Sequence, residues 1–126
     1  MKVLICEHEE LLLTTLVYRI RKHGFAVETA RNRKEALKLL RENSFDLLVA
    51  DIFSPEFLGI ALMRSIRRNS KNKKIPILLI ADLEQDELML HALKLGARDF
   101  VTKPFKPDEL VIRIKGILQS KMVNAK

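Results

Sequence analysis

Short apolar runs alternate with amphipathic stretches from one end of the chain to the other. Three of the five runs are apolar without interruption, which is typical of central strands in a parallel sheet covered on both faces. The run at 25–30 alternates apolar with polar positions, and the run at 98–101 is short and begins with a charge, so we expect both at the sheet edges. The predicted strands are residues 2–6, 25–30, 45–50, 75–81 and 98–101.

Between these strands, apolar residues recur every three or four positions, which predicts amphipathic helices. Asn32, followed three residues later by Glu35, predicts a capped helix start, and Gly24 and Gly96 predict helix ends. Pro107 stands where the first turn of the last helix tolerates a proline. The stripes are Leu13, Leu16, Val17 and Ile20; Ala36, Leu37 and Leu40; Leu62, Met63 and Ile66; Met89, Ala92 and Leu93; and Leu110, Val111, Ile114, Ile117 and Leu118.

The order of strands and helices is therefore (βα)₅ with short connections. Right-handed crossovers and two edge strands favour a doubly wound α/β sheet, because five units are too few for a barrel. In such sheets ligands bind beyond the carboxyl ends of the strands. We therefore look for functional residues directly after each strand.

Composition supports one ordered domain. The chain has 126 residues, 48% hydrophobic and 31% charged, and this length suffices to bury a full core. We place the domain at residues 2–119 and expect 120–126 to be a frayed tail or a cut linker, because the apolar stripe stops at Leu118. The single cysteine, Cys6, excludes a disulfide scaffold and suits the reducing cytoplasm. No apolar run approaches the roughly 18 residues that a membrane span needs.

The formal net charge of +7 raises the question of nucleic-acid binding. The basic residues are spread over several predicted helices, and the densest cluster, residues 67–74, reads as a loop after a helix. The chain has no zinc-finger spacing, one Tyr and no Trp for stacking on bases. A solvated basic surface is therefore favoured over direct nucleic-acid contact.

Charged side chains stand at the strand ends, where a ligand is expected. An aspartate can attack a phosphoryl donor when a lysine and a divalent cation neutralise the phosphoryl oxygens, and Mg²⁺ requires hard oxygen ligands such as carboxylates. Each acid alone is better explained as the cap of the following helix, but together the strand ends favour a site for acyl-phosphate formation. The residues are Glu7 and His8 after the first strand, Asp51 after the third, Asp82 after the fourth and Lys103 after the fifth.

Three segments carry a family resemblance: VLICEHE, LLVADIFSPEFLG and GARDFVTKPFKPDEL. The spacing of Asp51, Pro55 and Gly59 and the Lys-Pro-Phe run at 103–105 are specific in combination. The chain resembles the receiver domain of two-component response regulators over essentially its whole length, residues 2 to about 118. The resemblance implies a flavodoxin-like fold with five parallel strands in the order 2-1-3-4-5 and helices on both faces.

The resemblance implies a role for each matching residue. Asp51 falls on the phosphoacceptor position, and Lys103 on the position that contacts the phosphoryl group. Glu7, Asp51 and the backbone carbonyl of Phe53 fall on positions that hold Mg²⁺. Phe100 falls on the aromatic switch position, without the hydroxyl of a tyrosine. The bond from Lys103 to the following proline is expected to be cis.

Two positions depart from the family pattern. His8 replaces the second acid, which normally gives Mg²⁺ a carboxylate oxygen; an imidazole nitrogen suits Zn²⁺, Ni²⁺ or Cu²⁺ better. A histidine beside acids is more often no ligand at all, and a protonated one can pair with Asp51 or Glu7. Ala81 stands at the second switch position, where a Ser or Thr hydroxyl normally bonds the phosphoryl oxygen. Asp82 is either the cap of the next helix or an added charge near the pocket.

The resemblance leads to two functional hypotheses. In the first, a histidine kinase or phosphotransfer protein phosphorylates Asp51, and the face of the fourth helix, fifth strand and fifth helix changes its contacts with an output domain or effector protein. In the second, the chain is a pseudo-receiver that binds partners without phosphorylation. A stand-alone enzyme is not expected, since no Ser-His-Asp order, Cys-His pair or phosphate-cradling glycine loop is present.

Asp99 and Arg113 raise the question of a homodimer. They match acidic and basic positions that some receiver subfamilies use for salt bridges across the face of the fourth helix, fifth strand and fifth helix. We prefer an internal pair or ordinary exposed charge for these two residues.

Overall fold

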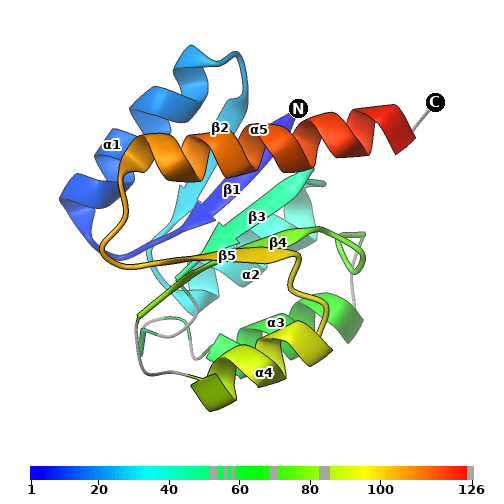
Figure 1. The fold of residues 1–126 in the computed structure, drawn as a ribbon. Helices are drawn as coiled ribbons and strands as arrows, with labels where there is room; N and C mark the ends of the chain where they lie inside the picture. The colour runs from blue at the N-terminus through cyan, green and yellow to red at the C-terminus, as the bar shows by residue number, and fades with distance from the viewer. Residues whose placement is uncertain (52–53, 56, 58, 69–70, 83–85, 125–126) are drawn as a thin grey trace.

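In the described part of the chain, five parallel strands form one sheet with helices on both faces in the computed structural model (Figure 1). The structure describes residues 1–51, 54, 55, 57, 59–68, 71–82 and 86–124. The sheet order β2-β1-β3-β4-β5 confirms the predicted doubly wound (βα)₅ fold and its two edge strands. None of the described helices is long and apolar enough to cross a membrane. The elements are β1 (Lys2–Cys6), α1 (Glu10–Lys22), β2 (Ala26–Ala30), α2 (Arg33–Glu42), β3 (Leu47–Ala50), α3 (Gly59–Arg68), β4 (Ile77–Ala81), α4 (Asp86–Lys94), β5 (Asp99–Thr102) and α5 (Pro107–Asn124).

The sheet separates two hydrophobic clusters, because successive residues of a strand point to opposite faces. Val3 and Ile5 of β1 pack with buried residues of α1 and α5, whereas Leu4 and Cys6 pack with residues of α2, α3 and α4. Figure 1 shows α1 and α5 on one side of the sheet and α3 and α4 on the other. The central strands β3 and β4 are buried along their whole length, as their uninterrupted apolar sequences predict.

Local sequence signals set the helix ends. Asn32 accepts the backbone N–H of Glu35 at 3.0 Å at the start of α2, as the predicted cap requires. Gly24 and Gly96 follow α1 and α4 with φ of 89° each, and the N–H of each bonds the carbonyl three residues back. Glycine adopts this left-handed conformation without strain, so both helices end where predicted.

Two strands begin two residues later than predicted. β3 starts at Leu47 and β4 at Ile77. Pro76 has no backbone N–H, so it cannot donate a hydrogen bond to a neighbouring strand. Its carbonyl still accepts the Leu48 N–H at 3.0 Å. The proline therefore delays β4 without breaking its contact with β3.

Helix α5 includes most of the segment that the sequence suggested as a frayed tail. Two polar contacts hold this extension: Lys121 Nζ lies 3.0 Å from Asp46 Oδ1, and Arg98 Nη2 lies 3.4 Å from Ser120 Oγ. The helix therefore continues to Asn124, beyond the end of its apolar stripe. The domain limits at residues 2 and 119 stay a prediction.

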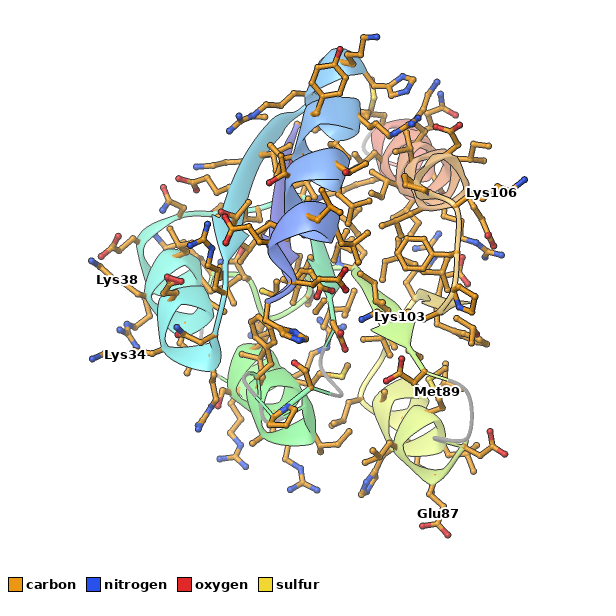
Figure 2. All side chains as sticks on the ribbon, turned by 90° about the vertical axis from the view of Figure 1, so that its left-hand side faces the viewer. Lys34, Lys38, Glu87, Met89, Lys103 and Lys106 are labelled. Atoms are coloured by element: carbon orange, nitrogen blue, oxygen red, sulfur yellow. The ribbon has the colours of Figure 1, made fainter. Side chains whose placement is uncertain are left out.

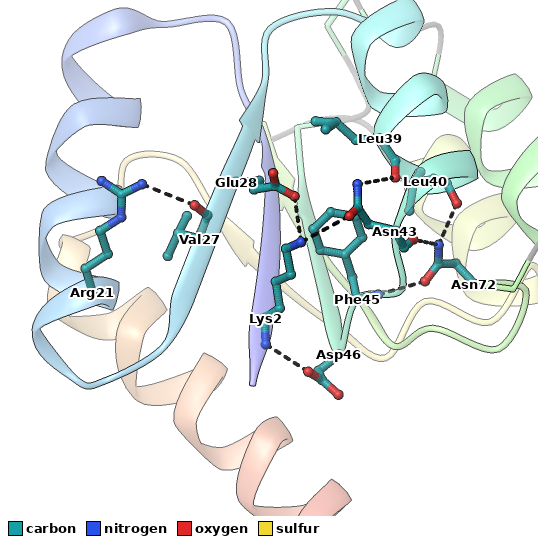
Figure 3. A network of polar contacts seen from close by, with 10 residues as sticks. All are labelled: Lys2, Arg21, Val27, Glu28, Leu39, Leu40, Asn43, Phe45, Asp46 and Asn72. Atoms are coloured by element: carbon teal, nitrogen blue, oxygen red, sulfur yellow. Dashed lines mark hydrogen bonds and ion pairs between the residues drawn. The ribbon is translucent and has the colours of Figure 1, made fainter.

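A polar network closes the base of the sheet, at the end opposite to the predicted site (Figure 3). Lys2 Nζ lies 3.0 Å from Glu28 Oε2 and 5.0 Å from the centroid of the Phe45 ring. The backbone N–H of Lys2 donates to Asp46 Oδ2 at 2.8 Å. The first residue of β1 is thus tied to β2 and to the start of β3.

Asn72 joins the loop after α3 to the connection between α2 and β3, and it is buried (Figure 3). Its Oδ1 accepts the Phe45 N–H at 2.9 Å. Its Nδ2 donates to the carbonyls of Leu40 and Asn43, both at 2.7 Å. One side chain therefore satisfies three backbone groups at the base of the sheet.

Arg67 shows that the basic segment 67–74 is more than a solvated loop. Its guanidinium donates to four backbone carbonyls and so ties the end of α3 to the start of β4 and to the turn after α4. The acceptors, at 2.7 to 3.0 Å, are Lys73, Ile75, Leu95 and Gly96. The charge of Arg67 therefore stabilises the fold and is not only part of a solvated surface.

We expect Asn72→Ala to lower the free energy of unfolding by about 2–4 kcal/mol, because three backbone groups lose their partner. Urea denaturation measures the loss. Lys71→Ala, which changes an exposed neighbour, is the control and should shift stability by less than about 0.5 kcal/mol. Equal stability of Asn72→Ala and the wild type would contradict the role given to Asn72.

Asp46 makes stability depend on pH in the acid range. Burial raises the pKa of Asp46, but the Lys2 N–H and Lys121 outweigh it and hold the pKa below its ordinary value. The ionised carboxylate thus stabilises the fold above the unfolded-state pKa, and this contribution is lost as the pH falls through the lower folded-state pKa. We expect Asp46→Asn to lower the free energy of unfolding by about 1 kcal/mol at pH 7.

This deficit should shrink once the pH falls below the ordinary aspartate pKa of about 3.9. Unfolding of the variant and the wild type at a series of pH values measures it. A deficit that stays constant down to the acid limit of folding would show that the Asp46 charge is not its source.

Candidate functional site

The ends of β1, β3 and β5 bring two carboxylates and one ammonium group together. Lys103 Nζ donates to Asp51 Oδ2 at 2.8 Å and lies 3.9 Å from Glu7 Oε2. Parallel strands deliver their carboxyl ends to the same edge of a sheet, which is why residues far apart in the sequence meet here. Figure 2 shows Lys103 pointing inward, whereas Glu87 on α4 points away from the molecule. The structure therefore joins three of the predicted site residues, and their roles stay predictions.

The Glu7 side chain is fixed by hydrogen bonds from the backbone of the two residues that follow it. Its Oε1 accepts the backbone N–H groups of His8 at 3.1 Å and Glu9 at 3.0 Å. The residue is fully buried, and its Oε2 has no hydrogen-bond donor in the part of the chain that the structure describes. Burial raises the pKa of Glu7 above its ordinary value, although the Glu9 N–H and the Lys103 charge oppose the shift. A bound cation would satisfy the oxygen that lacks a donor.

Lys103 balances the charge of the two acids. Burial lowers the pKa of Lys103, but the hydrogen bond and charge of Asp51, and then the charges of Glu7 and Asp82, outweigh it and hold the pKa above its ordinary value. The lysine is therefore a cation at neutral pH.

Glu7, His8 and Asp51 can offer ligand atoms that lie within 4.8 Å of one another. The two carboxylates fit Mg²⁺, which takes oxygen ligands in a near-octahedral arrangement. His8 does not fit Mg²⁺, because an imidazole nitrogen suits transition metals better. Its Nδ1 lies 3.4 Å from Glu7 Oε1, so a protonated His8 pairs with Glu7. The donor set as a whole disagrees with a Mg²⁺ site built from oxygen ligands alone.

The remaining predicted residues lie beside this cluster or outside the described chain. Phe53, expected to give its backbone carbonyl to the metal, lies outside the described residues. Ala81 is buried at the end of β4, and Phe100 in β5 is 40% exposed. Both line a groove of about 380 Å³ between α4 and β5. The Lys103-Pro104 bond is cis, as the resemblance implies.

Thr102 is a residue that sequence reasoning did not single out. It pairs with Ala81 in the register of β4 and β5 and lines the same groove. The strand next to Ala81 therefore carries a hydroxyl group, which Ala81 itself lacks. The sequence shows a threonine directly before Lys103. It does not show the strand register, and so it could not predict that this threonine lies beside Ala81.

The two residues considered for a dimer contact meet within one chain. Arg113 Nη1 lies 2.8 Å from Asp99 Oδ2, and Arg113 Nη2 lies 3.7 Å from Glu109 Oε1. The internal pair that we preferred is therefore present in the structure.

Comparison with known proteins gives a consistent picture. The family model for the response regulator receiver domain matches residues 3–115. The chain is 36% identical to the alkaline phosphatase synthesis transcriptional regulatory protein PhoP of Bacillus subtilis (strain 168), over 98% of this chain and 51% of that protein. It is 34% identical to the phosphate regulon transcriptional regulatory protein PhoB of Rhizobium meliloti (strain 1021), over 94% of this chain and 52% of that protein. The chain thus spans about half the length of these relatives.

Solved structures give the same result for the fold. The receiver domain of the Francisella response regulator 1452 superimposes with a TM-score of 0.83 and 30% identity, covering 95% of this chain and 98% of that one. The non-phosphorylated HemR receiver domain from Leptospira biflexa superimposes with a TM-score of 0.83 and 33% identity, covering 93% of each chain.

We expect Lys103→Met to lower the free energy of unfolding at pH 7 by about 2 kcal/mol, because two buried carboxylates lose their shared cation. The double variant Lys103→Met/Asp51→Asn should recover part of the loss, since it removes one of the charges left behind. Lys106→Met, at an exposed lysine of similar size, is the matched control. The electrostatic account is wrong if Lys103→Met is as stable as the wild type, or if the double variant recovers nothing, in urea denaturation.

Proposed function

This chain belongs to the response regulator receiver domain family, and we propose that Asp51 accepts a phosphoryl group from a histidine kinase or a phosphotransfer protein. The observation that carries the proposal is the 2.8 Å contact between Lys103 Nζ and Asp51 Oδ2 beside the buried Glu7. Receiver domains are signalling modules rather than free-standing enzymes, so the partner supplies the phosphoryl donor and this chain supplies the acceptor.

The proposed reaction is transfer from a phosphohistidine to a carboxylate. One Asp51 oxygen attacks the phosphorus, an O–P bond forms, and the N–P bond of the donor breaks with its electron pair going to the imidazole, which takes up a proton. Lys103 neutralises part of the charge on the phosphoryl oxygens from its place beside Asp51. Receiver domains generally bind Mg²⁺ in an acidic site, and a divalent cation there adds further neutralisation when bound.

We propose that phosphorylation of Asp51 changes the protein contacts made by the groove between α4 and β5. Phe100, Leu90 and Leu93 are large apolar residues that are exposed along it. Exposed apolar patches of this kind mark sites of protein contact. Because the chain spans about half the length of its curated relatives, an output domain or an effector protein is the proposed recipient of the signal. A homodimer through α4, β5 and α5 would use the same face.

The proposed role places the chain in the cytoplasm, and its one cysteine agrees with that location. Cys6 is a free, fully buried thiol in β1. Burial raises the pKa of the Cys6 thiol, with smaller contributions from the charges of Glu35 and Glu7, so the reactive thiolate is not formed at neutral pH.

Two residues favour a second candidate, a pseudo-receiver that binds its partners without phosphorylation. Ala81 brings no hydroxyl to the phosphoryl position, and His8 stands where the family has a second carboxylate. Both changes lie at the site, while the scaffold around it matches the family. The two candidates differ in one observable, the formation of a phosphoryl adduct on Asp51.

We expect the purified chain to form a single phosphoryl adduct with acetyl phosphate and a divalent cation, read by intact mass. Asp51→Asn should abolish the adduct, because an amide oxygen is not a competent nucleophile. Asp46→Asn is the matched control, since it changes the aspartate at the opposite end of the same strand and should leave the adduct unchanged.

The outcomes separate the two candidates. An adduct that persists in Asp51→Asn would place the acceptor elsewhere. No adduct with either Mg²⁺ or a transition metal, under conditions that phosphorylate another receiver domain, would favour the pseudo-receiver.

A further inference from the structure

The donor set at the end of β1 differs from that of a Mg²⁺ site in one ligand. Glu7 and Asp51 offer carboxylate oxygens, and His8 offers a nitrogen, all within 4.8 Å of one another. Two ligands about 2.1 Å from one ion lie up to ~4.2 Å apart, so a small movement of the His8 side chain closes the set. The His8 side chain is 40% exposed, so solvent borders it on the side from which an ion would enter.

We propose that this site selects a divalent transition-metal ion that accepts an imidazole nitrogen, with Glu7, His8 and Asp51 as its protein ligands, in place of Mg²⁺. A mixed set of carboxylate and imidazole ligands is typical of transition-metal sites, whereas Mg²⁺ keeps to oxygen and retains several waters. Zn²⁺ is the probe of choice, because it binds both ligand types in flexible geometry.

A second observation points to a cation, independently of the ligand types. Glu7 is fully buried, and among the described residues no hydrogen-bond donor reaches its Oε2. The Lys103 ammonium lies 3.9 Å from this oxygen, beyond hydrogen-bonding distance, because it is bonded to Asp51. A buried carboxylate oxygen without a donor is destabilising unless another positive charge reaches it. A metal ion between Glu7 and Asp51 would supply that charge.

The turn after β1 positions the histidine for this role. The His8 N–H donates to Glu7 Oε1 at 3.1 Å, and its Nδ1 lies 3.4 Å from the same oxygen. The imidazole is thereby kept on the carboxylate side of the turn. The site is open where His8 is exposed, so water or a phosphoryl oxygen can complete the coordination.

This inference deepens the proposed function, since it concerns the cation of the same site, but its test uses no phosphoryl transfer. Isothermal titration of the 126-residue chain with Zn²⁺ and with Mg²⁺ gives the two affinities. Zn²⁺ binds most nitrogen and oxygen sites more tightly than Mg²⁺, so the ratio in the wild type alone is not decisive. The change in that ratio when His8 is replaced is decisive.

We expect His8→Ala to weaken Zn²⁺ binding at least about tenfold, because even groups that only support a metal ligand contribute 10- to 100-fold. Mg²⁺ binding should change little in His8→Ala. His8→Asp should weaken Zn²⁺ binding and strengthen Mg²⁺ binding, since it restores an oxygen ligand. His91→Ala, at an exposed histidine of α4, is the matched control for adventitious Zn²⁺ and should leave the tighter site unchanged.

NMR spectra of the histidine side chains show directly whether His8 binds the metal ion. Addition of Zn²⁺ should shift the imidazole nitrogen resonances that disappear in His8→Ala, before those of the other histidines. The proposal is overturned if His8→Ala binds Zn²⁺ as tightly as the wild type, or if His8→Asp leaves the ratio of the two affinities unchanged.

The two proposals fail separately. An adduct on Asp51 with Mg²⁺, together with unchanged Zn²⁺ binding in His8→Ala, would retain the phosphoryl acceptor and reject the metal selectivity. His8-dependent Zn²⁺ binding without any adduct would retain the metal site and reject the phosphoryl acceptor.

Discussion

The contact between Lys103 and Asp51 is the interaction on which the charged end of the sheet depends. Glu7 and Asp51 are both buried, and two carboxylates in one low-dielectric pocket repel each other unless a positive charge lies beside them. Lys103 brings that charge from the end of β5, which pairs with β4 at the edge of the sheet. The register of an edge strand therefore decides whether the two acids on the central strands are tolerated.

The two ends of the sheet differ in how their buried polar groups are hydrogen-bonded. At the base, Asn72 and Arg67 satisfy backbone groups one by one, and Asp46 holds both Lys2 and Lys121. At the site, one oxygen of the buried Glu7 has no hydrogen-bond donor among the described residues. Proteins commonly keep such unfavourable groups at functional sites and compensate for them elsewhere. A ligand that supplies positive charge would therefore be favoured at this end of the sheet.

The two departures from the family pattern that the resemblance implies, His8 and Ala81, lie at the proposed site and not in the scaffold. His8 is half-exposed in a turn, and Ala81 ends a strand whose backbone pairing needs no particular side chain. The fold as a whole matches solved receiver domains with TM-scores of 0.83. Similarity of fold therefore does not test the cation or the phosphoryl contacts that we propose at these two positions, because function resides in the site.

The sequence by itself determined the order of the strands, the edges of the sheet and the helix ends at Gly24 and Gly96, although not the first residues of β3 and β4. These features follow from apolar periodicity and from backbone conformations within a few residues. It also indicated that the strand ends would converge, since all parallel strands end on one side. Only the tertiary structure decided that Thr102 lies beside Ala81 and that Asn72 bonds backbone groups across the base. These contacts join atoms that are distant in sequence, and their partners depend on strand register and helix docking, which no local pattern contains.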